Sequence, residues 1–90
     1  MSTVTLSKPI KAYGEDVLEF ELREPTGAEI RKIGAPITFK DDGSYDFDMN
    51  RVAKYVATLA TPPLTPNAVD QVAAQDWMKM AAALIPFFAG

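Results

Sequence analysis

A strand-to-helix junction near residue 25 constrains this chain more than any other stretch of its sequence. Leu18, Phe20 and Leu22 alternate with charged residues, which is the period of a half-buried β-strand. Pro25 has no N–H to donate to a β-ladder, and it favours extended geometry at Glu24. The sequence therefore predicts a strand that ends here.

The residues after this proline predict the start of a helix. Thr26 and Glu29 have capping-box spacing, in which the Thr hydroxyl accepts from the Glu N–H and the Glu carboxylate accepts from the Thr N–H. We expect a short helix over residues 27–33, ended by Gly34 and Pro36. We interpret five residues as a structural joint and not as a chemical site: Arg23, Glu24, Pro25, Thr26 and Glu29.

The chain before the joint predicts a β-hairpin. Val4, Leu6 and Ile10 share one parity and hence one strand face, while Pro9 is typical of an edge strand. A three-residue loop over residues 13–15 would set Ile10 opposite Leu18 and Leu6 opposite Leu22, which gathers the apolar side chains on one side. We therefore expect that register.

The chain after the first helix predicts a second hairpin and then further helices. Residues 37–48 contain an Asp-Gly turn between short apolar runs, and the alternative is a polar loop with two packed aromatic side chains. A helix capped by Asp46 or Asp48 should carry Met49, Val52, Val56 and Leu59 on one face. Thr65 and Pro66 begin a third helix, with Val69, Val72 and Ala73 inward, and residues 75–76 open the last.

These elements define the expected fold class. It is α+β, with an N-terminal antiparallel β-hairpin packed against a C-terminal bundle of three to four short helices. The 90 residues are nearly half hydrophobic and about a quarter charged, which is typical of one small globular domain over residues 1–90.

The composition excludes several classes of function. The net charge is −3 and there is no basic run, so we expect no nucleic-acid partner. No apolar run reaches the roughly 20 residues of a membrane helix, so we expect no membrane contact. The chain has no Cys and no His, so the usual nucleophile–base pairs are absent and we expect no enzyme and no cofactor. The lack of Cys also fits a reducing cytoplasm.

One acidic stretch resembles the beginning of a calcium loop. Asp46, Asp48 and Asn50 have the spacing of its first ligands. The sixth position is Arg51 where a Gly is required, and the twelfth is Ala57 where a Glu should chelate. We therefore predict no metal site, and we interpret the stretch as a solvated turn with a helix cap.

The C-terminal third is nearly free of charge. From residue 55 onward the charged residues are Asp70, Asp76 and Lys79, although outer helix faces normally carry more charge. Exposed apolar patches mark partner surfaces. We therefore expect the last helix to bind a partner and to mediate self-association, with the residues from 84 onward least used by the core. The candidate partner-binding residues are Trp77, Met80, Leu84, Ile85, Phe87 and Phe88, of which Trp77 and Met80 also fit a core position.

Three segments together resemble a known family. They are the L-x-K-P-I run of the first strand, the L-R-E-P-T-x-x-E-I joint and an A-x-D-W-x-x-M run at residues 74–80. The chain is similar in these segments to the tail assembly chaperones of long-tailed phages, of the Mu and P2-like type. The likeness extends over most of the chain.

The resemblance implies a specific role. Such a protein acts in the host cytoplasm, binds the tape measure protein, keeps that long apolar helical protein soluble and presents it for tail tube assembly. It is absent from the mature virion. The implied partners also include a longer form of the chain made by frameshifting near Phe87 and Phe88, and the tail tube protein. The alternative is a structural tail component or small adaptor subunit with a permanent apolar helical interface.

Overall fold

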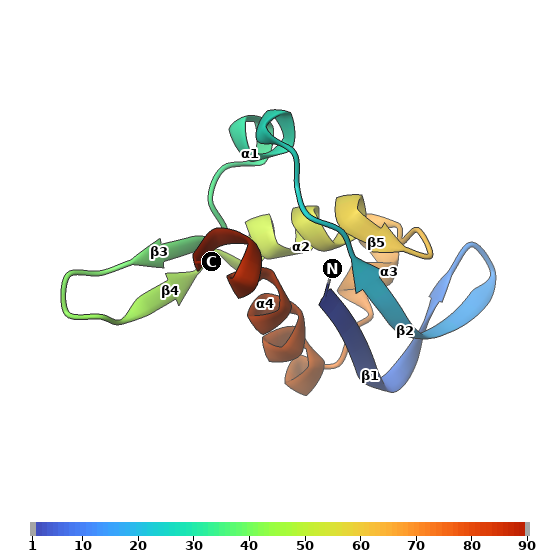
Figure 1. Ribbon diagram of the computed structural model, residues 1–90. Helices are drawn as coiled ribbons and strands as arrows, with labels where there is room; N and C mark the ends of the chain where they lie inside the picture. Colours follow the sequence, from blue (N-terminus) through green and yellow to red (C-terminus); the bar gives the residue numbers. More distant parts are fainter. Residues whose placement is uncertain (1, 90) are drawn as a thin grey trace.

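The computed structural model describes residues 2–89 and confirms the α+β class. The two sheets are small, and α2 and α4 lie beside the larger one (Figure 1). In chain order the elements are β1 (Ser2–Ala12), β2 (Glu15–Leu22), α1 (Gly27–Ile33), β3 (Ile37–Phe39), β4 (Tyr45–Phe47), α2 (Met49–Leu59), β5 (Ala60–Thr61), α3 (Pro66–Asp70) and α4 (Ala74–Ala89).

The hairpin of β1 and β2 forms as predicted, but the predicted register is wrong. Ala12 pairs with Glu15, so the loop has two residues, and Ile10 lies opposite Val17. The loop residues Tyr13 and Gly14 both have positive φ, at 52° and 79°. A two-residue type I′ turn requires this conformation, and its twist matches that of the flanking strands. The turn therefore sets the register at this end of the hairpin.

A bulge in β1 changes the register again further along the hairpin. Pairing shifts between Thr5 and Ile10, so the β1 residues between them lie opposite the single position Leu18. Val4 then pairs with Phe20, and both side chains are buried. Leu18 is 50% exposed, so its assignment to the buried face of the strand is wrong. An extra stretch in one strand breaks the simple alternation of faces.

A third strand, which the sequence analysis did not predict, completes the larger sheet. The sheet has the order β1-β2-β5, with Leu22 paired to Ala60 in antiparallel fashion. The N–H of Arg23 also donates to the carbonyl of Leu59 at 3.2 Å. The end of β2 is thereby attached to the end of α2, and β1 remains at the outer edge of the sheet.

The joint has the predicted capping box. The Thr26 hydroxyl accepts from the Glu29 N–H at 3.2 Å, and a Glu29 carboxylate oxygen accepts from the Thr26 N–H at 2.9 Å. The guanidinium of Arg23 forms a bidentate ion pair with the same carboxylate, in which its two terminal nitrogens donate to the two Glu29 oxygens at 2.9 and 2.7 Å. The helix α1 has the predicted bounds, although none of its residues is buried. No fully buried face therefore anchors α1. Local hydrogen bonds and this ion pair hold the helix in position.

The second hairpin, β3–β4, is confirmed and projects from the body of the molecule (Figure 1). Asp48 then caps α2 by accepting from the Arg51 N–H at 3.1 Å. Met49 was predicted on the inner face of this helix but is 40% exposed. Tyr55 is fully buried instead, and its hydroxyl donates to the Gly34 carbonyl at 2.8 Å. This bond attaches the end of α1 to α2.

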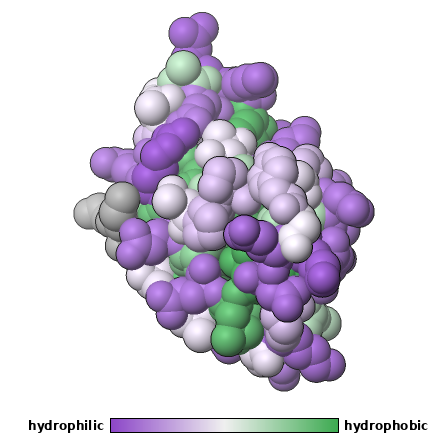
Figure 2. Space-filling model, turned by 90° about the vertical axis from the view of Figure 1, so that its right-hand side faces the viewer, coloured by the Kyte–Doolittle hydropathy of each residue, from purple (hydrophilic) through white to green (hydrophobic). Residues whose placement is uncertain are grey.

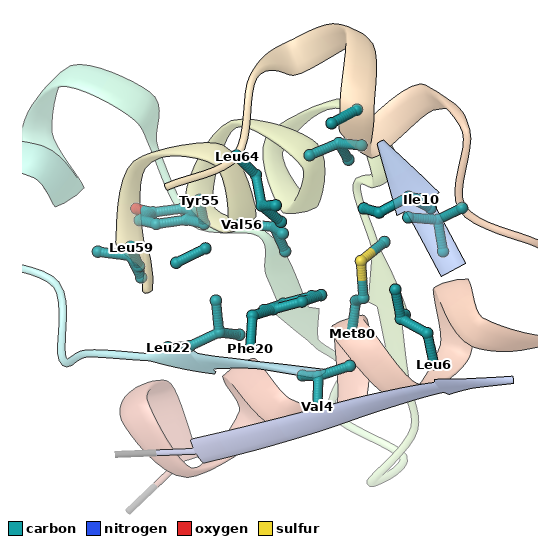
Figure 3. Close-up of a cluster of buried hydrophobic side chains, with 14 of the residues drawn as sticks. Val4, Leu6, Ile10, Phe20, Leu22, Tyr55, Val56, Leu59, Leu64 and Met80 are labelled. Atoms are coloured by element: carbon teal, nitrogen blue, oxygen red, sulfur yellow. The ribbon is translucent and has the colours of Figure 1, made fainter. Parts of the chain in front are cut away.

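The hydrophobic core lies between the larger sheet and the helices α2, α3 and α4. Phe20 points from β2 into the centre of this cluster, where Met80 of α4 lies beside its ring and Val56 of α2 lies across from it (Figure 3). Thr65 caps α3 with Pro66 at its first turn, as predicted. The other labelled core side chains are Val4, Leu6, Ile10, Leu22, Tyr55, Leu59 and Leu64.

Candidate partner-binding surface

The first turn of α4 is attached to the edge strand of the sheet. One carboxylate oxygen of Asp76 accepts hydrogen bonds from the Ser7 N–H at 3.0 Å and from the Ser7 hydroxyl at 2.9 Å. The side-chain amide of Gln75 donates to the same hydroxyl at 2.6 Å. Ser7 belongs to the bulge of β1, so these bonds fix the position of α4 along the outer edge of the sheet.

Asp76 is fully buried, and its surroundings on balance favour the charged carboxylate. Burial by itself would raise the pKa of this carboxyl, but hydrogen bonds from Ser7 and the ammonium of Lys79 outweigh burial and lower the pKa. The Lys79 nitrogen lies 3.3 Å from the second carboxylate oxygen and also donates to the Thr5 carbonyl at 3.3 Å. The sequence analysis predicted neither contact, although Asp76 and Lys79 are three residues apart on the same helix.

Part of the predicted binding surface of α4 belongs to the core. Met80 and Leu84 have no exposed surface, and Ala81 beside them is also buried. The expectation that Leu84 lies outside the core is therefore wrong. The three residues share the inner face of α4, which packs on β1 and α2. A side chain on this face cannot meet a partner while the domain is folded.

Three aromatic candidates lie at the boundary of the core. Trp77, Phe87 and Phe88 are partly buried and pack against it. The Trp77 ring nitrogen donates to the Val72 carbonyl at 3.1 Å, and the Phe88 ring meets Tyr55 edge-on with centroids 5.4 Å apart. These rings have intramolecular contacts as well as an exposed part, and their role in partner binding stays a prediction.

A second, outward-facing row of apolar residues runs along α4. Met78 is 55% exposed, Ala82 is exposed and Ile85 is half-buried without packing on the core cluster. Their spacing of i, i+4 and i+7 places them on one helix face. We call these three residues the outer stripe of α4. Of the three, the sequence analysis named only Ile85 as a candidate partner-binding residue, together with Met80 and Leu84 of the inner face.

A groove lies next to the outer stripe. It has a volume of about 590 Å³ and lies between the first residues of β1 and α4. Its walls are Ser2, Thr3, Val4, Thr5, Lys79, Ala82 and Ala83. The two alanines project little from the helix, so another backbone can approach closely at this point. The groove and the outer stripe share Ala82 and form one continuous surface.

Within residues 2–89 no group of three or more metal-ligating acidic side chains occurs. The acidic stretch that resembles a calcium loop is used locally, since Asp48 caps α2 and Asp46 pairs with Lys40 at 2.9 Å. Over the same residues no helix is long and apolar enough to cross a membrane.

The fold and surface define a class of protein, namely a small α+β domain that presents an apolar helical surface beside a sheet edge. The family model described as "Phage tail assembly chaperone proteins, E, or 41 or 14" matches residues 3–89. The chain therefore belongs to this family of phage tail assembly chaperones. No curated protein and no solved structure matches the chain.

Proposed function

We propose that this protein is a non-enzymatic chaperone that binds the tape measure protein of its phage. It keeps that long apolar helical protein soluble and presents it for assembly of the tail tube. Family membership supports the proposal, and the observation that carries it is the outer stripe of α4. Covering an apolar helix requires an apolar surface but no reactive group, in agreement with the chemistry of this chain.

The outer stripe suits a helical partner. Met78 and Ile85 are large and apolar, and Ala82 between them leaves room for a facing side chain. An amphipathic partner helix docks through apolar residues at the same spacing. Methionine adapts its shape to irregular partners, and such adaptation is useful along a tape measure protein with many different apolar segments. Trp77 and Phe87 are only partly buried, but the helical spacing places neither of them on the outer stripe.

The proposal includes a place and a time of action. The protein works in the cytoplasm of the infected host, releases its client as the tube forms and is absent from the finished virion. Mass spectrometry of purified virions tests this point, because a structural tail component would remain in them. A longer form of the chain, made by frameshifting near Phe87 and Phe88, is part of the same proposal, and the gene must then contain a slippery run before the stop codon.

Co-expression with the tape measure protein tests the central claim. The double variant Met78→Asp with Ile85→Asp places two charges on the outer stripe without touching the core. We expect the wild-type chain to keep the tape measure protein soluble and to co-purify with it, and we expect the variant to do neither. A few anchor residues usually carry most of an interface's energy, so two changes suffice.

The control is Asp41→Ala with Asp42→Ala in the turn of β3–β4, which should bind as the wild-type chain does. Each variant must first show native far-UV circular dichroism and cooperative melting. If the folded outer-stripe variant still retains the tape measure protein while the turn variant loses it, the binding surface lies in the hairpins and the proposal is wrong.

A further inference from the structure

Side chains cover the outer edge of β1 over most of its length. The Ser7 N–H donates to Asp76 at 3.0 Å. The Lys11 N–H donates to the side-chain oxygen of Gln71 at 3.1 Å, and the Lys11 carbonyl accepts from the same side chain at 3.4 Å. Pro9 lies between them and has no N–H to donate. Sheets protect their edges in such ways against pairing with other chains.

The first residues of β1 form the part of this edge that is left open. The Thr5 carbonyl points outward, since Lys79 donates to it at 3.3 Å. Pairing with β2 is regular from Ser2 to Thr5, and alternate residues of an edge strand face outward. Both polar backbone groups of Thr3 and the N–H of Thr5 therefore face outward too. Within residues 2–89 none of these three groups forms a hydrogen bond.

This open part of the edge forms one wall of the groove of about 590 Å³. The helix α4, which lies beside β1 (Figure 1), forms the other wall with Lys79, Ala82 and Ala83. The charge of Lys79 is compensated by Asp76, so the groove presents unpaired backbone groups beside small apolar side chains. The other end of the sheet differs, because the side of the molecule at the β1–β2 turn is mostly hydrophilic (Figure 2).

We propose that an extended segment of the tape measure protein lies in this groove and pairs with β1 as an additional strand. An N–H, a C=O and a second N–H on alternate residues match the backbone of another strand, and such pairing is a recurrent mode of peptide recognition. The residue of the segment that lies beside Val4 points towards α4, where Ala82 and Ala83 leave room for an apolar side chain.

This inference rests on the proposed function, because it names the part of the client that the groove takes. The groove and the outer stripe share Ala82. A client helix on the outer stripe therefore reaches the edge of β1 through the extended segment next to it in the client's sequence. The helix contributes apolar contacts, and the extended segment contributes backbone hydrogen bonds.

The position of α4 favours such a segment over a second copy of the chain. Two copies paired in antiparallel fashion through β1 would be related by a two-fold axis, with both α4 helices on the same face of the joined sheet. Each α4 lies along the outer edge of its own β1, because Asp76 and Lys79 both bind outward-facing groups of that strand. The two helices would therefore meet above the paired edges. A segment without a helix on that face avoids this clash.

Amide hydrogen exchange of the purified chain, free and in complex with the tape measure protein, tests the pairing. The Val4 N–H faces β2 and should exchange slowly in both states. The Thr3 and Thr5 N–H groups should exchange quickly in the free chain and at least about tenfold more slowly in the complex. Exchange of these two amides that is equally fast in both states would overturn the inference.

Variants of the groove test the same contact through affinity. Thr5→Pro removes the outward N–H and leaves the pairing of β1 with β2 intact. It should lower the affinity for the tape measure protein roughly tenfold, since a hydrogen bond is lost and a client carbonyl stays unpaired. The control Thr5→Ala keeps the N–H and loses only the hydroxyl with its bond to Glu19, so it should bind normally. Ala83→Gln narrows the groove without changing the strand and should also weaken binding. Each variant must first melt cooperatively.

The outcomes separate this inference from the proposed function. A wild-type chain that does not bind the tape measure protein overturns both. If the wild type binds and the outer-stripe variant does not, while Thr5→Pro and Ala83→Gln bind with wild-type affinity, the client uses the outer stripe alone and the strand pairing is wrong. Sedimentation of the free chain adds a further check. A dimer that Thr5→Pro converts to a monomer would assign the edge to a second copy and overturn the inference as well.

Discussion

Asp76 in α4 accepts two hydrogen bonds from Ser7 in β1, although the two residues are 69 positions apart in the chain. The bonds join the first turn of the last helix to the bulge of the edge strand. A carboxylate in the first turn of a helix also meets the positive end of the helix dipole. The pair therefore couples the position of the outer stripe of α4 to the shape of β1.

The two sides of this contact should contribute unequally to stability. Ser7→Ala removes the hydroxyl donor but leaves the backbone N–H bonded to Asp76, so we expect a loss on the order of 1 kcal/mol in the free energy of unfolding. Asp76→Ala leaves that N–H without its acceptor and should lower the urea midpoint further. Asp70→Ala, an exposed carboxylate on α3, serves as the control. Equal losses for the two variants would contradict this order.

Acid should weaken the joint between β2 and α1. The hydrogen bonds from the Arg23 guanidinium, and then that from the Thr26 N–H, lower the pKa of Glu29 from 4.5 to about 2. Because the pKa is lower in the folded state than in the unfolded state, the stabilisation is fully present above pH 4.5 and is lost as the pH falls towards 2. Glu29→Gln lacks this carboxylate.

The measurement is a thermal melt of the wild type and Glu29→Gln at a series of pH values. The difference in melting temperature should be constant near neutral pH and shrink between pH 4.5 and about 2. Asp76 titrates in the acidic range in both proteins, so comparing them isolates Glu29. A difference that does not change with pH would mean that the ion pair does not stabilise the fold.

Local sequence signals predicted the elements of this fold well, and long-range effects account for what they missed. The capping box of Thr26 and Glu29 and the cap at Thr65 depend on a few adjacent residues, and both were predicted correctly. The register of β1 and β2 depends on a bulge whose partner, Asp76, is far away in the sequence. The strand β5 has two residues, too few for a periodic pattern.

The candidate site was predicted at the level of the helix but not of its faces. The lack of charge in α4 drew attention to this element, and its role in partner binding stays a prediction. Its inner and outer faces are both apolar, so hydropathy could not separate Leu84, which is buried, from Ile85, which is half-buried. The packing of β1 against the helix decides which face is used by the core, and that packing again depends on the bulge.

Two neighbouring positions on β2 test the observed strand faces. Phe20 is 1% exposed at the centre of the core, so Phe20→Ala should cost about 3–5 kcal/mol. Leu18→Ala removes a half-exposed side chain and should cost less than about 1 kcal/mol. Urea unfolding of both variants at low protein concentration, where self-association does not contribute, gives the two values. A larger loss for Leu18→Ala would reverse the assignment of the faces.

Adjacent residues of α4 should separate folding from partner binding. Leu84→Asp buries an unpaired carboxylate in the core, which is costly enough to unfold a domain of this size. Ile85→Asp places the same group on the outer stripe, where water can reach it, so the melting temperature should change little. We therefore expect Leu84→Asp to lose cooperative melting and tape measure binding together, and Ile85→Asp to lose binding alone.

Circular dichroism melts and co-purification with the tape measure protein measure the two effects. A folded Ile85→Asp that still binds with wild-type yield would exclude this residue from the interface, and a folded Leu84→Asp would contradict its place in the core.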